Sequence, residues 1–274
     1  MYPNNQKKTG KQIAGEVYTA LLLIFIYVPV GVMIAFSFNN SRVNMVWSGF
    51  TLKYYRQLFQ DSELWHIFGI TLFIALIATV LAVFIATLGA VGFRKAKFPG
   101  KKLIEQSVYF PIVLPEIVLG AALLLMFTTA GFTLGLATII IGNTTLLLPY
   151  VFITVKARLV GMDPAIEEAS LDLGADRFYT FMHITLPAIG PGVVSGAFMS
   201  FSLALDELIV TSFLTSADIT TLPIKVYSMV KKGVTPEINA LTTIIFLICM
   251  AGVLVYLIRN GMTVRHLKQT QRGA

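Results

Sequence analysis

Three acidic side chains lie inside long apolar stretches of the sequence: Glu116, Asp206 and Glu207. A charge at the bilayer centre costs at least about 2.5–3.5 kcal/mol, so such residues usually face a bundle interior and mark a pathway. No Lys or Arg lies in the same apolar stretches to neutralise them. The three acids therefore predict a pathway for cations, in which the rings of Tyr109 and Phe110 would contact ammonium groups.

The surroundings of these acids leave their individual roles open. Pro111 and Pro115 are expected to bend or break the segment that carries Glu116, so this carboxylate could instead cap or pack beside the break. Asp206 and Glu207 are adjacent and point about 100° apart on a helix. At most one of these two is expected to face a central pathway, and the other would contact a neighbouring helix or subunit.

A polar stretch between two apolar segments has the pattern of a short capped helix. Asp163 can cap its start, and Pro164 suits the first helical position. Gly174 suits the left-handed conformation that ends helices. We expect a helix over residues 164–173. One face of it would carry Ile166, Ala169, Ser170 and Leu173, with Glu167, Glu168 and Asp172 on other faces, near water or a basic partner.

A second short helix is expected from Asp176 to about His183, with Phe178, Phe181 and Met182 as its apolar contacts. Leu186-Pro187 would then restart the chain as the next apolar segment. By itself, this pattern of helix, glycine, helix and proline also fits an amphipathic loop lying on a membrane surface.

The elements that must position these residues are apolar helices. Of the 274 residues, 56% are hydrophobic and 13% are charged, whereas soluble domains carry about 25% charged residues. Runs of about 20 apolar residues span a bilayer as helices. Six such runs cover residues 17–38, 68–93, 107–127, 132–155, 188–214 and 239–258. The sequence thus predicts an all-α integral membrane protein with six transmembrane helices.

The basic residues predict the orientation. Alternating the six runs places 15 Lys and Arg on one side and 6 on the other, and positive charge marks the cytoplasmic side. Both termini, residues 1–16 and 259–274, are then cytoplasmic, as is the loop 156–187, whereas the loop 39–67 is external. The first run is too long for a typical cleaved signal peptide. With no soluble domain to carry a basic groove, the net charge of +7 is a topology signal and predicts no nucleic-acid partner.

Several site types find no support in the sequence. Cys249 is the single cysteine and is expected to pack as a small apolar residue, and the three histidines are far apart, so we expect no metal site. Gly10-Lys11 and Gly100-Lys101 lack the upstream glycine and the hydroxyl residue of a P-loop. Any uphill transport must then draw its energy from a partner or an ion gradient.

Small and hydroxyl residues predict helix packing. Gly131 with Gly135, and Gly192 with Gly196, have the spacing that lets helices approach closely, for which packing within the chain is the expected use. Hydrogen bonds across helices are expected from Thr211, Ser212, Thr215 and Ser216.

The spacing of Glu168-Ala169-Ser170, Gly174, Ile184 and Leu186-Pro187 at this place in a six-span topology resembles the EAA loop of type I ABC importer permeases. In that family the short helix is a coupling helix that docks in a groove of a cytoplasmic ATPase. The resemblance implies ATPase-coupling roles for Ile166, Glu168, Ala169, Ser170, Leu173 and Gly174, with Ser170 in place of the usual second Ala.

Two further stretches, residues 47–55 and 222–240, look like the external loops of spermidine/putrescine importer permeases. The resemblance covers most of the chain and implies a multi-pass protein of the bacterial plasma membrane, in which residues 68–258 form an ABC transmembrane type-1 domain of five helices. It implies no cofactor on this chain, with ATP and Mg on the partner. The implied partners are a second homologous permease, a cytoplasmic ABC ATPase dimer, an external substrate-binding protein and membrane lipid.

Other functions remain open at this point. The chain could be a permease for another small substrate in the same importer class. It could also be a self-sufficient channel or ion-driven carrier. A membrane enzyme is disfavoured, because no catalytic constellation occurs in the sequence.

Overall fold

The computed structural model describes residues 10–41, 46–233, 235–248 and 250–252, and their side chains from residue 15 onward. Cys249, His266 and the end of the sixth predicted run lie outside these residues. In the described part the regular structure is helical, with one isolated antiparallel bridge between Asn39 and Phe50. The chain divides into two units, residues 1–62 with 228–274, and residues 63–227.

The first unit contains α1 (Gly10–Phe36) and α2 (Lys53–Gln60). The Asn39 side chain is buried and holds the connecting loop, because it donates to Val46 O and accepts from Ser48 N. Phe38 stacks on Phe50 and contacts Tyr55. The same unit contains a further apolar helix, Pro236–Gly252.

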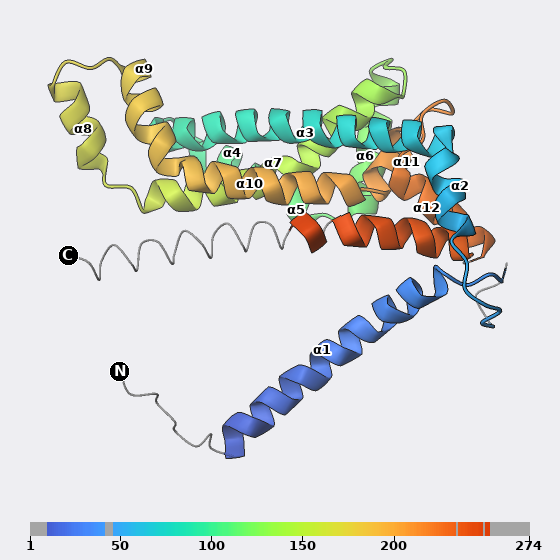
Figure 1. The fold of residues 1–274 in the computed structure, drawn as a ribbon. Helices are drawn as coiled ribbons and strands as arrows, with labels where there is room; N and C mark the ends of the chain where they lie inside the picture. The colour runs from blue at the N-terminus through green and yellow to red at the C-terminus, as the bar shows by residue number, and fades with distance from the viewer. Residues whose placement is uncertain (1–9, 42–45, 234, 249, 253–274) are drawn as a thin grey trace. The chain divides into compact units, whose positions relative to one another are not determined.

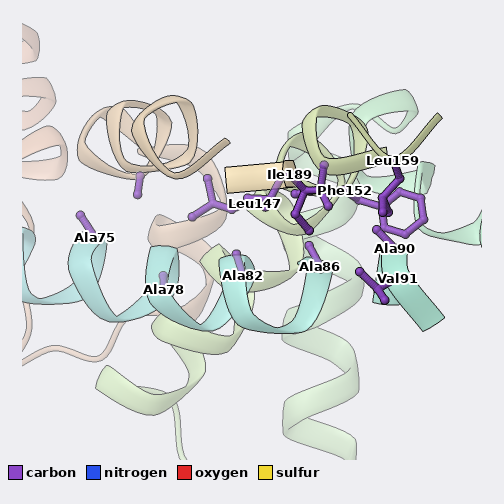
Figure 2. Close-up of a cluster of buried hydrophobic side chains, with 13 residues drawn as sticks. Ala75, Ala78, Ala82, Ala86, Ala90, Val91, Leu147, Phe152, Leu159 and Ile189 are labelled. Carbon is purple, nitrogen blue, oxygen red and sulfur yellow. The ribbon is translucent and has the colours of Figure 1, made fainter. Parts of the chain in front are cut away.

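Three long helices form the frame of the second unit (Figure 1): α3 (Ser62–Lys95), α7 (Leu136–Val160) and α10 (Leu186–Asp206). A stripe of small side chains on α3 faces the larger side chains of the other two helices, and Figure 2 shows Ala82 and Ala86 opposite Leu147, Phe152 and Ile189. The stripe consists of Ala75, Ala78, Ala82, Ala86 and Ala90. Because alanine is short, it allows close contact between the helix backbones.

Glycine allows a second close contact, between α10 and α7. A Cβ atom on Gly192 would lie 2.8 Å from Thr154 O, and one on Gly196 would lie 3.1 Å from the Cα of Val151. The prediction that this glycine pair packs within the chain is confirmed. The same interpretation of Gly131 and Gly135 is wrong, because both lie outside helices with positive φ, in the turn before α7.

Two of the predicted runs are broken helices. The third begins at the end of α4 (Lys101–Ser107) and contains α5 (Phe110–Val113) and α6 (Glu116–Thr129), which are separate helices because Leu114 and Pro115 are extended. The break at Pro115 is the one that the prolines predicted. The fifth run breaks where Glu207 is extended, between α10 and α11 (Ile209–Leu214), a break that the sequence analysis missed. The second unit ends with most of α12 (Leu222–Lys232).

Among the residues that the structure describes, four helices are long and apolar enough to cross a membrane: Gly15–Phe36, Ser62–Lys95, Leu136–Val160 and Arg177–Asp206. They correspond to the first, second, fourth and fifth predicted runs. The third and sixth runs correspond to the shorter apolar helices Glu116–Thr129 and Pro236–Gly252. The count of six spans therefore stays a prediction.

Candidate functional site

The capped helix predicted in the polar loop is present as α8 (Pro164–Asp172). The Asp163 carboxylate accepts a hydrogen bond from Ala165 N at 3.0 Å, and Pro164 is the first helical residue. Gly174 follows with φ +87°, a left-handed conformation that glycine adopts without a Cβ clash. The start and stop signals of this helix were thus read correctly from the sequence.

The predicted face of α8 with Ile166, Ala169, Ser170 and Leu173 is only partly exposed. The side chain of Ile166 is 53% exposed and that of Leu173 is 89% exposed. Ser170 instead points inward, where its hydroxyl lies 3.0 Å from that of Thr180. Together with Ala175, Asp176, Tyr179 and Ile184, the α8 side borders an open hollow of about 710 Å³. The hollow is lined by five of the predicted coupling residues, Ile166, Ala169, Ser170, Leu173 and Gly174.

Glu167 was expected near water or a basic partner, and the structure places it away from water and beside basic side chains. It is only 8% exposed, and its basic partners belong to this chain. The hydroxyl of Thr185 donates to its carboxylate, with Lys95 Nζ at 3.3 Å and Arg94 Nη1 at 3.8 Å. Burial opposes ionisation, but the hydroxyl and the two cations outweigh it and hold the pKa of Glu167 below its ordinary value.

The sequence predicted that the second short helix ends near His183, before the apolar segment. In the structure this helix continues into the apolar segment. Asp176 caps α9 (Arg177–Thr180) by accepting from Tyr179 N at 2.6 Å. A π-helical turn, η1 (Phe181–Thr185), then joins α9 to α10 without interruption. The N–H of Leu186 donates to Phe181 O, five residues earlier, which is the hydrogen-bond spacing of a π-helix. The helix therefore continues through this turn to Pro187. Phe178, expected to pack, is 69% exposed, whereas Phe181 packs against the core.

The acids of the apolar segments lie at the ends of the broken helices. Glu116 is the first residue of α6, and Asp206 is the last residue of α10, and both are exposed. Glu207 is buried, and its carboxylate accepts a hydrogen bond from Val210 N at 2.6 Å, in the first turn of α11. Glu207 thereby satisfies one of the free N–H groups that begin every helix.

The two breaks are close to each other because α6 and α11 pack together. A Cβ atom on Gly120 of α6 would overlap the ring of Phe213 of α11. Across this contact Glu116 is an acidic neighbour of Glu207. Asn143 of α7 donates to the Thr211 hydroxyl at 3.1 Å, so the hydrogen bond expected across helices is present for Thr211. Ser212 instead bonds within its own helix.

Tyr109 and Phe110 lie in the segment between α4 and α6. The Tyr109 hydroxyl accepts a hydrogen bond from Lys156 Nζ at 3.2 Å, and its ring meets that of Phe152 edge-on. Lys156 is also 2.6 Å from the Glu105 carboxylate. Phe110 is exposed. Sequence analysis missed this ion pair and those of Glu167, although the expected topology already placed all five charged residues on one side of the membrane.

Within the residues that the structure describes, no group of three or more His, Cys, Asp and Glu could hold a metal ion.

Comparisons with known proteins concern nearly the whole chain. Residues 78–268 match the family model described as "Binding-protein-dependent transport system inner membrane component". The chain is 36% identical over 245 residues to the spermidine/putrescine transport system permease protein PotC of Escherichia coli (strain K12), covering 89% of this chain and 92% of that protein. It is also 36% identical over 228 residues to the putrescine transport system permease protein PotI of the same strain, covering 81% of each.

A solved structure has the same fold. It belongs to a bacterial ABC transporter involved in the import of the acidic polysaccharide alginate, and it aligns with a TM-score of 0.70 over 92% of this chain and 99% of that chain. At 16% identity, the likeness concerns the fold alone.

Proposed function

This chain belongs to the family of binding-protein-dependent transport system inner membrane components, and we propose that it forms half of the transmembrane pathway of an ATP-driven importer of spermidine and putrescine. The family assigns it the multi-pass permease part of a bacterial ABC importer, with ATP hydrolysis on a separate subunit and delivery by a binding protein.

The coupling half of the proposal rests on α8. Its outer side chains, Ile166, Glu168, Ala169 and Leu173, are exposed and border or adjoin the open hollow. An exposed apolar side chain such as Leu173 is costly in water and gains by burial in a partner. We propose that this surface enters a groove of the ATPase. Ser170 would hold α8 to Thr180, and Gly174 would form the turn that ends the helix.

The substrate half rests on the helix breaks. Broken transmembrane helices that meet near the middle of a membrane commonly form the binding sites of transporters. Here Glu116 begins α6 beyond one break, and Asp206 and Glu207 lie at the other break. A polyamine has several ammonium groups joined by apolar linkers, which complement carboxylates interleaved with aromatic rings such as Tyr109 and Phe110. The curated relatives named for spermidine and putrescine support the same substrate class.

The remaining architecture is proposed as follows. Six spans leave both termini cytoplasmic, the coupling loop is 156–187, and residues 68–258 are the type-1 transmembrane domain. A second, homologous permease completes the pathway, an ABC ATPase dimer carries ATP and Mg, and membrane lipid surrounds the helices. The external loop 39–67 either anchors the chain at the membrane interface or contacts the binding protein.

The test is uptake by the reconstituted complex. The chain is purified from membranes with its bound subunits, which mass spectrometry identifies, and the complex is placed in liposomes with ATP and the binding protein. Labelled spermidine or putrescine should accumulate only with hydrolysable ATP. If the complex assembles and accumulates a different small substrate but neither polyamine, the importer class stands and the polyamine assignment is wrong.

A further inference from the structure

The short helix α8 has little packing of its own against the transmembrane frame. Figure 1 shows it as a separate short helix beside α9, and its main packing partners among the described elements are α9 and η1. Only two of its side chains are buried, those of Glu167 and Ser170. A displacement of α8 by a partner must therefore reach the transmembrane helices largely through these two side chains.

Ser170 connects α8 only to its immediate neighbour α9, through Thr180. Glu167 connects it to two separate helices. One contact is the hydroxyl of Thr185 in η1, which continues directly into α10. The others are Lys95 and Arg94, the last two residues of α3. The carboxylate is thus the shared point of α8, α3 and α10.

Arg94, which contacts Glu167, also binds the segment just before α8. Arg94 Nη2 donates to Met162 O at 3.3 Å, one residue before the cap of α8. The side chains of Glu167 and Arg94 are 11% and 22% exposed. Lys95 is 47% exposed, so the ion pairs of Glu167 are partly buried. Removing the cations would leave the Glu167 charge poorly compensated, so these pairs resist separation. The contacts of Glu167 therefore favour joint movement of α8 with the end of α3.

We propose that Glu167 is a positioning residue that couples displacement of α8 to α3 and α10, and so determines how much transport follows from each ATP hydrolysed. This rests on the proposed function, because it presumes that an ATPase displaces α8. It assigns a role to an inward-facing residue, distinct from the exposed side chains that would contact the ATPase. Without the Glu167 charge, α8 keeps its Asp163 cap and its Gly174 stop but is loosely attached.

The experiment uses the complete complex in liposomes with its binding protein. Glu167→Gln keeps the shape and an acceptor for Thr185 but loses both ion pairs. Changes in coupling elements alter coupling by about 0.5–2 kcal/mol, or about 2- to 30-fold. We expect uptake per ATP to decrease within that range, while subunit assembly and basal ATP hydrolysis are retained. Asp172→Asn is the matched control, since it neutralises an exposed carboxylate on the same helix, and it should match the wild type.

Lys95 supplies a second test, away from α8. Lys95→Met should lower uptake per ATP, whereas Lys95→Arg, which keeps the charge, should retain it. Lys95→Met combined with Glu167→Gln should cost less than the sum of the two single changes, because both remove one interaction. Should Glu167→Gln fail to assemble, the two Lys95 variants carry the test alone.

Unchanged uptake per ATP in Glu167→Gln, or equal losses in Lys95→Met and Lys95→Arg, would overturn the proposal. A parallel loss of assembly in Glu167→Gln and Lys95→Met would also overturn it, since the contact would then be needed only for docking. The wild-type complex separates this outcome from failure of the proposed function: absence of polyamine uptake by the wild type refutes the substrate, whatever the variants do.

Discussion

Acidic residues of similar sequence context have different surroundings in this protein. Glu167 and Glu168 are neighbours in one helix, yet the first is buried against Lys95 and the second is exposed. Asp206 and Glu207 are also neighbours, and only Glu207 is buried. In the first pair the about 100° turn between adjacent helical residues separates the two side chains. In the second pair α10 ends at Asp206, and the extended backbone of Glu207 directs its side chain to α11. One member is held by the protein, and the other remains available to a partner or substrate.

This division predicts different effects for Asp206 and Glu207. Asp206→Asn should raise the KM for polyamine uptake with little change in thermal unfolding, because the side chain is exposed at the end of α10. Glu207→Ala should lower stability by about 0.5–2 kcal/mol, since an N–H group of α11 loses its acceptor. Thermal unfolding of the purified complex and uptake kinetics measure both. A stable Glu207→Ala complex with an unfolded Asp206→Asn complex would contradict the assignment.

The lowered pKa of Glu167 has a pH consequence. A carboxyl with a depressed pKa stabilises the folded state above its unfolded pKa of about 4.3 and loses this contribution as the pH falls through the folded value. Amide exchange in α8, corrected for intrinsic rates, should be constant from about pH 8 to 6 and should rise only below about pH 4. Glu167→Gln should show a smaller acid-dependent rise, because it keeps the Asp163 cap but has no carboxylate at residue 167. Loosening already near neutral pH in the wild type would contradict the prediction.

At the scale of elements, close helix contacts depend on particular glycines. Gly196→Ala should destabilise the protein by about 1–3 kcal/mol, because the new Cβ would press on Thr154 and Val151 of α7. Gly190→Ala is the control on the same helix, where a Cβ meets nothing within 4 Å. Alanine is a better helix former than glycine, so this control should keep or gain stability in thermal unfolding. Equal effects at both positions would refute the contact.

The coupling loop depends on the left-handed turn at Gly174. Gly174→Ala should cost about 1–2 kcal/mol of loop stability, since φ +87° forces a Cβ close to the following carbonyl. Gly161→Ala, at the other end of the loop, is the control, because Gly161 has φ −81° and ordinary room for a Cβ. The affinity for the ATPase in co-purification measures the effect. A Gly174→Ala chain that binds the ATPase as tightly as the control would count against α8 as the docking element.

At the scale of the whole molecule, the family assignment predicts that this chain cannot transport alone. It lacks a P-loop, and its proposed pathway is half of a two-permease channel. The chain by itself in liposomes should show no polyamine uptake, with or without ATP or an ion gradient, and uptake should appear when the partner permease and ATPase are added. Uptake by the lone chain would instead favour the self-sufficient channel or carrier.

Much of the loop could be read from the sequence because its signals are local. Asp163, Pro164 and Gly174 each act within one turn of helix, so the bounds of α8 followed from residue types alone. The break in the fifth run was not predicted, because no proline lies near Glu207 to indicate it. That carboxylate stabilises the break only because its chain turns back to place Val210 N within reach.

The sequence by itself determined the apolar helices, the cap and stop of α8 and the family, because periodicity, composition and motif spacing are properties of contiguous residues. Only the tertiary structure decided that Ser170 and Glu167 face inward, that α9 runs on into α10, and that the breaks beside Glu116 and Glu207 are neighbours. The continuity of α9 with α10 depends on the local π-helical turn. The other facts depend on contacts between residues far apart in the chain, such as Lys95 with Glu167 and Gly120 with Phe213. Such contacts arise from the packing of whole helices, which no local pattern records.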